Sequence, residues 1–126
     1  MITQYFSTVR QALQEYSHII SSYTSEEKVY SDEKGYVQYT VVFIDRSVLE
    51  FAEVKFTDQE SKVKYRYHFM DEQSSLIFRY DNAKHHPDVS TFPHHKHLSK
   101  GVIKSSEPSI QTVLKEVEEY IVDKLR

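Results

Sequence analysis

The strongest constraint on the fold is the alternation of side chains between residues 62 and 70. Every second residue there is apolar or aromatic, and the residues between them are basic. The first set is Val63, Tyr65, Tyr67 and Phe69, and the second is Lys64, Arg66 and His68. Because side chains alternate between the two faces of a β-strand, this pattern predicts a strand with one buried and one basic face.

Three further segments have the composition of strands. Residues 36–44 and 48–57 are rich in β-branched and aromatic types, and residues 76–81 alternate again. Short polar turns separate these segments, so an antiparallel meander is favoured. Residues 101–104 predict a short additional edge strand.

Apolar residues at steps of three and four predict a helix at each end of the chain. The first stripe is Ile2, Phe6, Val9, Leu13, Tyr16, Ile20 and Tyr23. The second stripe is Ile110, Val113, Leu114, Val117, Ile121 and Leu125. Ser106 is the expected N-cap of the second helix, with Pro108 in its first turn.

This order of elements predicts an α+β fold. An antiparallel meander sheet of four to five strands carries the N-terminal and C-terminal helices on one face and leaves the other face open. With 126 residues, the chain has the size of a single domain, 1–126.

The open face of the last hairpin has a predicted register. Aligning the apolar sets of the two strands places Arg66 opposite Arg79 and Lys64 opposite Asp81. His68 follows Arg66 on the same face of the sheet. Two arginines facing each other repel unless an anion or a carboxylate lies between them. Arg66, Arg79 and Lys64 are therefore candidates for binding a phosphate, and pairing with carboxylates is the alternative.

Composition excludes several classes of chemistry. The chain has no Cys, which rules out disulfides, thiolate zinc sites and cysteine nucleophiles. The net charge is −3, but residues 79–104 hold five Lys or Arg against two Asp, a local charge of +3. No apolar run is long enough to span a membrane, and residues 1–5 do not resemble a signal peptide, so we expect a cytoplasmic protein without membrane contact.

The feature that points to chemistry is a group of histidines. Five of the seven lie in an aperiodic segment, 82–100, that the sequence predicts to be a long loop. They are His85, His86, His94, His95 and His97. Imidazole exchanges protons near neutral pH, so two of these side chains could act as base and acid on RNA while arginine holds the phosphate. Asp81 would orient one of them, with His68, Asn82 and Tyr80 as supporting residues.

Two other interpretations of this segment stay open. His95 and His97, or His94 and His97, could share a metal ion with His85 or His86, although no recognised zinc spacing is present. The segment could instead bind a partner without any catalysis. The favoured chemistry uses neither a metal nor another cofactor.

The string from Phe78 to Pro87, followed by Thr91 to His97, resembles the TumE-like toxin family of prokaryotic toxin–antitoxin modules. The resemblance implies a small cytoplasmic toxin that a helix-turn-helix antitoxin neutralises. Carried over residue by residue, the family signature falls on Arg79, Asp81, Asn82, His85, His86, Pro93, His94, His95 and His97.

The sequence therefore predicts a toxin that cleaves RNA without a metal. The alternatives are a protein that sequesters a partner through its histidine and aromatic loop, and a metal-dependent hydrolase. Oligomeric state is left open, with a homodimer as one option.

Overall fold

The computed structural model describes all residues, 1–126, and its centre is one antiparallel sheet of seven strands in sequence order. The strands are β1 (Ile20–Ser31), β2 (Lys34–Phe43), β3 (Val48–Phe56), β4 (Lys64–Met70), β5 (Leu76–Asp81), β6 (His95–Leu98) and β7 (Gly101–Lys104). The helices are α1 (Ile2–Glu15) and α2 (Ile110–Lys124), with a 3-10 turn at Ser17–Ile19. The α+β class and the meander are confirmed, but the sheet has seven strands rather than four to five.

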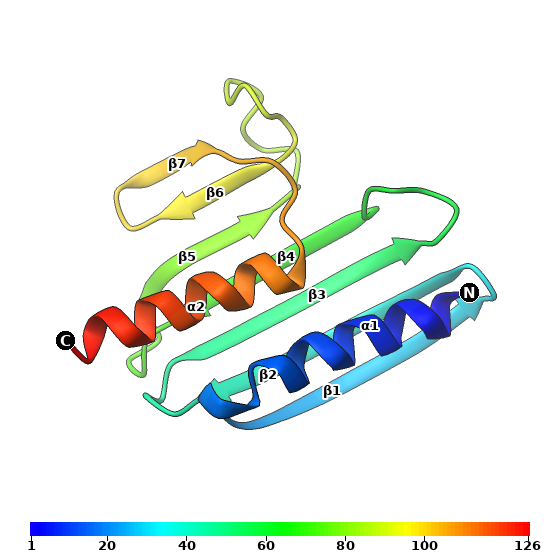
Figure 1. Cartoon of the computed structure of the whole chain (residues 1–126). Coiled ribbons are helices and arrows are strands. Elements are labelled where there is room, and N and C mark those ends of the chain that lie inside the picture. The colour runs from blue at the N-terminus through cyan, green and yellow to red at the C-terminus, as the bar shows by residue number, and fades with distance from the viewer.

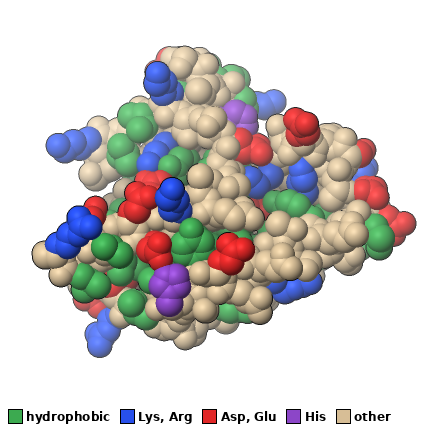
Figure 2. All heavy atoms as spheres, viewed as in Figure 1, with side chains coloured by type: hydrophobic (Ala, Val, Ile, Leu, Met, Phe, Trp, Pro, Cys, Tyr) green, Lys and Arg blue, Asp and Glu red, His purple; other side chains and the backbone are tan.

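Both helices lie on the same face of the sheet, as predicted. Figure 1 shows α1 over β1 and β2 and α2 over the strands that follow β3, with the β6–β7 hairpin beyond them. On this helix-covered side, acidic and basic side chains are interspersed and little histidine surface is visible (Figure 2). Neither helix combines the length and apolar character needed to cross a membrane.

The first missed strand is β1. The predicted helix ran to Tyr23, but α1 ends at Glu15, and Ile20 and Tyr23 belong to β1. Nearly every side chain of β1 is exposed, so its sequence carries no apolar alternation. Its backbone pairs with β2 from Ile20 to Ser31, and these tertiary hydrogen bonds outweigh the local helical pattern.

The second missed strand is β6, within the segment predicted to be a loop. His95–Leu98 pairs with β5 on one side and with β7 on the other, which leaves residues 82–94 as the connection. The predicted edge strand at 101–104 is present as β7. The N-cap of α2 is Ser109 rather than Ser106, because the Ser109 hydroxyl accepts from the Thr112 N–H while Thr112 accepts from the Ser109 N–H.

The hairpin of β4 and β5 has a register two residues away from the predicted one. Arg66 lies opposite Asp81, and His68 lies opposite Arg79. The ladder shifts by one residue between Phe69 and Met70, a β-bulge that strict alternation could not reveal. From Arg66 to Phe69 the pairing differs from the predicted register by two residues, so these positions and their partners keep their predicted faces, but the two arginines do not face each other. Beyond the bulge the faces differ from the prediction, because Leu76 pairs with Met70 of the open set and Ile77 packs against the core.

Aromatic side chains on the covered face form the centre of the core. Tyr39 stacks on Phe51 at 5.0 Å between ring centroids, and Phe51 lies 5.6 Å from Tyr67 on the next strand. These three residues pair directly across β2, β3 and β4. The helices cover this row with their apolar stripes, so the periodicity of each helix and the alternation of each strand meet in one core.

One charged residue lies within this core. Glu53 is only 1% exposed, and its carboxylate accepts hydrogen bonds from the hydroxyls of Tyr5 on α1 and Tyr67 on β4. Burial, followed by the nearby Glu53 charge, raises the pKa of both phenols. The two hydroxyls therefore stay protonated and serve as permanent donors to the carboxylate.

We predict that Tyr67→Phe lowers the free energy of unfolding by about 1–3 kcal/mol, because Glu53 loses one of its two buried donors. Tyr30→Phe, at the exposed end of β1, is the matched control and should change stability little. Urea unfolding of the two variants measures the difference. Equal stability of both variants would show that the Tyr67 hydroxyl does not support Glu53.

Candidate functional site

Three strands bring a group of charged and imidazole side chains together on the open face. Arg66, Asp81 and His95 are directly opposite one another on β4, β5 and β6, and Arg79 is opposite His97. Residues paired across an antiparallel ladder point to the same face. His86 reaches the same place from the 82–94 connection, with its ring centroid 4.9 Å from that of His95. We call these six residues the open-face cluster.

Asp81 is the centre of the open-face cluster and is only 5% exposed. Its Oδ2 accepts from Arg79 Nε at 3.1 Å, and its Oδ1 accepts from the Ala83 backbone N–H at 3.0 Å. His97 Nε2 lies 3.3 Å from Oδ2. A buried carboxylate requires such partners, so Asp81 fixes the relative positions of the strands and side chains around it.

His97 is held as a neutral imidazole. An Arg79 N–H donates to His97 Nε2 over 3.1 Å, and a guanidinium has no acceptor. Nε2 therefore carries a lone pair rather than a proton. Burial, followed by the charge of Arg79, lowers the pKa of His97 below its ordinary value.

His95 is almost completely buried and its orientation is fixed by the backbone. Its Nδ1 donates to the Pro93 carbonyl oxygen over 2.9 Å, which leaves Nε2 with the lone pair when the ring is neutral. Nε2 is 2.8 Å from Asp81 Oδ1, yet it has no partner in hydrogen-bonding geometry. The ligating atoms of His86, His95 and His97 lie within 4.8 Å of one another, so these three could hold a metal.

A surface pocket opens beside the cluster. Its charged and imidazole lining is Lys64, Arg66, Arg79, Asp81, His85, His86 and His97. Lys64 and Arg66 are exposed and form no ion pair or side-chain hydrogen bond, so both are available to an anion. Lys64, Arg66 and Arg79 all line this pocket, but Arg79 pairs with the Asp81 carboxylate, as the alternative had it. The anion site stays a prediction, and repulsion between facing arginines does not support it.

Other predicted site residues lie outside the cluster. His94 turns toward the buried face, where its Nδ1 is 2.8 Å from the Tyr65 hydroxyl. Tyr80 donates to Glu116 on α2 over 2.5 Å. Asn82 binds the backbone of Tyr65 and therefore supports the beginning of β4.

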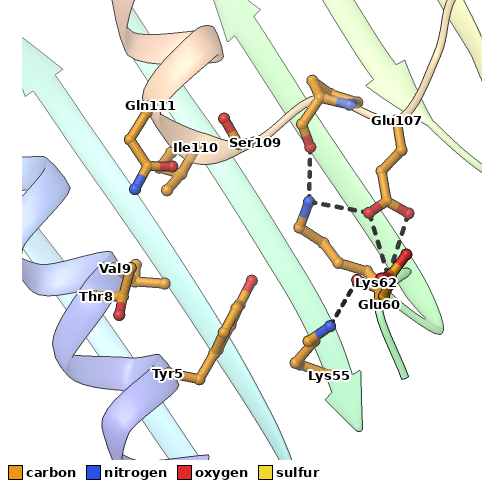
Figure 3. A pocket seen from close by; sticks show the side chains of 11 residues that line it. Tyr5, Thr8, Val9, Lys55, Glu60, Lys62, Glu107, Ser109, Ile110 and Gln111 are labelled. Atoms are coloured by element: carbon orange, nitrogen blue, oxygen red, sulfur yellow. Dashed lines mark hydrogen bonds and ion pairs between the residues drawn. The ribbon is translucent and has the colours of Figure 1, made fainter. Parts of the chain in front are cut away.

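A polar contact that the sequence did not indicate lies between the start of α2 and the turn before β4. Lys62 Nζ donates to the Pro108 carbonyl over 2.6 Å, and the Lys62 backbone N–H donates to Glu107 over 3.2 Å (Figure 3). Lys62 and Glu107 are 45 residues apart, so no local pattern brings them together. The contact closes one side of a pocket between the two helices that Tyr5 and Lys55 also line.

The comparison with protein families matches residues 9–125 to the family described as Toxin TumE. The match covers nearly the whole chain, so the chain belongs to the TumE toxin family. Membership makes it a toxin component and implies an antitoxin partner. No curated protein and no solved structure matches the chain.

We predict that acidification lowers stability through His68 on the open face. Burial, then Arg79 and Arg66, lowers the pKa of His68, while Glu50 across the ladder opposes the shift. The unfolded chain therefore binds this proton at a higher pH, near 6.5, than the folded chain does. The stabilisation is fully present above that pH and is lost as the pH falls toward the folded pKa.

Urea unfolding at about pH 7.5 and about pH 5.5 measures this loss. His68→Gln removes the titrating group and should lose less stability between the two pH values than the parent does. An equal loss in both proteins would assign the pH dependence to other groups.

Proposed function

We propose that this toxin cleaves RNA in the pocket beside the open-face cluster, by acid–base chemistry that needs no metal. The observation that carries the proposal is the pocket itself, which combines the unpaired cations Lys64 and Arg66 with the neutral imidazole of His97. Cationic side chains suit the phosphate of a nucleic acid, and arginine binds it through paired N–H groups.

In the proposed reaction, the Arg79 N–H that bonds to His97 turns to the phosphate, and the freed lone pair of His97 Nε2 takes the proton of a ribose 2′-hydroxyl. The 2′-oxygen then forms a bond to phosphorus while the bond from phosphorus to the 5′-oxygen breaks. A protonated His86 gives its proton to the departing oxygen, so a 2′,3′-cyclic phosphate and a 5′-hydroxyl are formed. Arg66, Arg79 and Lys64 bind the phosphate oxygens, whose charge increases in the transition state.

The remaining members of the open-face cluster would position these groups. Asp81 contacts both Arg79 and His97, so it can hold the guanidinium and the imidazole in one arrangement. His95 is too buried to reach a substrate and packs against His97, with ring centroids 4.8 Å apart. We assign it a positioning role, and we leave His94 and Tyr80 outside the reaction because they face the helices.

We also propose that the antitoxin is a helix-turn-helix protein, as the resemblance of residues 78–97 implies. A helix-turn-helix reading frame beside this gene would support the assignment. The homodimer stays a prediction.

We predict that purified toxin cleaves RNA in EDTA and that His97→Ala slows cleavage by about 10²–10⁴-fold, the usual contribution of a positioned acid or base. Arg79→Ala should slow it by about 10²–10³-fold, because the transition-state charge on the phosphate loses a donor. His18→Ala is the control, because His18 pairs with Glu118 on the helix-covered side. The readout is the cleavage rate on a short RNA, together with circular dichroism to confirm folding.

A ribose lacking the 2′-hydroxyl at the cleaved position should block the reaction. If toxicity persists and RNA stays intact under every condition, sequestration of a partner is the correct function. If cleavage stops in EDTA and returns with a metal, the metal-free step is wrong.

A further inference from the structure

We infer that His86, His95 and His97 form a binding site for a zinc-type divalent ion, with Asp81 as the adjacent carboxylate. The metal site itself does not depend on RNA cleavage. Its effect on activity rests on the proposed function, because the ion and the reaction would use the same ring nitrogens.

The first observation is the unpartnered nitrogen of His95. The ring is 1% exposed, and its Nδ1–H is already engaged by the Pro93 carbonyl. Nε2 is thus buried 2.8 Å from the Asp81 carboxylate without a partner in hydrogen-bonding geometry, and in the neutral ring it carries the lone pair. A lone pair and a carboxylate oxygen that are buried side by side repel each other and have lost their hydration. A positive charge between or beside them would offset this cost.

The second observation is that the neighbouring imidazole is in the same state. His97 Nε2 accepts from Arg79 and therefore also carries a lone pair, and it too lies against Asp81. Metal-ligating histidines characteristically bind through one nitrogen while the other donates to a carbonyl or carboxylate, as His95 does to Pro93. In their neutral forms both rings therefore present Nε2 lone pairs toward Asp81, as ligation of a metal requires.

The third observation is the completion of the set by His86. Its ligating nitrogen and those of His95 and His97 lie within 4.8 Å of one another. In a tetrahedral site with Zn–N bonds of about 2.0–2.1 Å, ligand atoms are roughly 3.3 Å apart. His86 is half-buried on a connecting segment, so a small movement of this side chain closes the set.

The donor types determine the kind of ion. Imidazole nitrogens with one carboxylate suit Zn²⁺, Co²⁺ and Ni²⁺, whereas Mg²⁺ and Ca²⁺ prefer oxygen ligands. Arg79 opposes binding, because its guanidinium contacts both His97 and Asp81 in the metal-free arrangement. The Arg79 side chain is 34% exposed and can move toward solvent, so a bound ion would take over its role as the positive partner of Asp81.

The test is titration of the EDTA-stripped and dialysed full chain with Zn²⁺ by calorimetry and with Co²⁺ by visible absorption. We expect one ion per chain and the intense cobalt spectrum of tetrahedral coordination. His86→Ala should weaken binding by at least about 10–100-fold. His94→Gln, on the buried side of the same segment, is the matched control and should bind as the parent does.

Arg79→Ala separates a metal site from a merely structural role. Removing the competing guanidinium should tighten Zn²⁺ binding, which damage to the fold would not do. Absence of binding, a weak six-coordinate cobalt spectrum, or equal affinity of the His86→Ala and His94→Gln variants would overturn the inference.

Cleavage assays distinguish this inference from the proposed function. Zn²⁺ that slows cleavage by the stripped toxin supports both, because the ion occupies the lone pair of His97. Zn²⁺ that is required for cleavage supports the metal site and refutes the metal-free mechanism. Cleavage without any metal binding refutes the metal site alone.

Discussion

The open-face cluster depends on one buried charge, the carboxylate of Asp81. It lies at the end of β5. Burying it without cationic or N–H partners would be costly, because an unpaired ion in a protein interior loses on the order of several kcal/mol of solvation free energy. Arg79 and the Ala83 backbone provide those partners, and β6 places His95 and His97 against the same carboxylate. The β6 strand has little apolar side chain to bury, so its attachment to β5 relies on backbone pairing and on this charge.

The sequence predicted the elements whose apolar side chains form the core. Strand β4 and both helices could be predicted because their buried side chains recur with the period of the element. Tyr67 belongs to the buried set of β4, Phe6 to that of α1 and Val113 to that of α2. Strands β1 and β6 could not be predicted, because they lack such a periodic set of buried apolar side chains. Their side chains are largely exposed or polar, so their conformation is determined by pairing with a neighbouring strand that lies elsewhere in the sequence.

The candidate site was predictable in its residue types but not in its geometry. Clustered histidines and Asp81 are uncommon enough in a chain without Cys to stand out. Which histidines meet depends on where β6 begins. His95, its first residue, points to Asp81 on the open face, whereas His94, just before the strand, contacts Tyr65 on the buried face. The positions of Arg66 and Arg79 depended on the bulge in the β4–β5 hairpin, which no alternation pattern records.

If both proposals hold, the cluster couples the binding of anions to the binding of cations. Arg79 is at once the partner of Asp81 and a proposed phosphate ligand, so a phosphate that draws its guanidinium outward deprives Asp81 of positive charge. A metal ion beside His95 would then be bound more tightly. By linkage, a bound ion would strengthen phosphate binding by the same factor. Under the proposed mechanism such an ion would hold RNA more firmly while removing the base from His97, so affinity and cleavage would change in opposite directions.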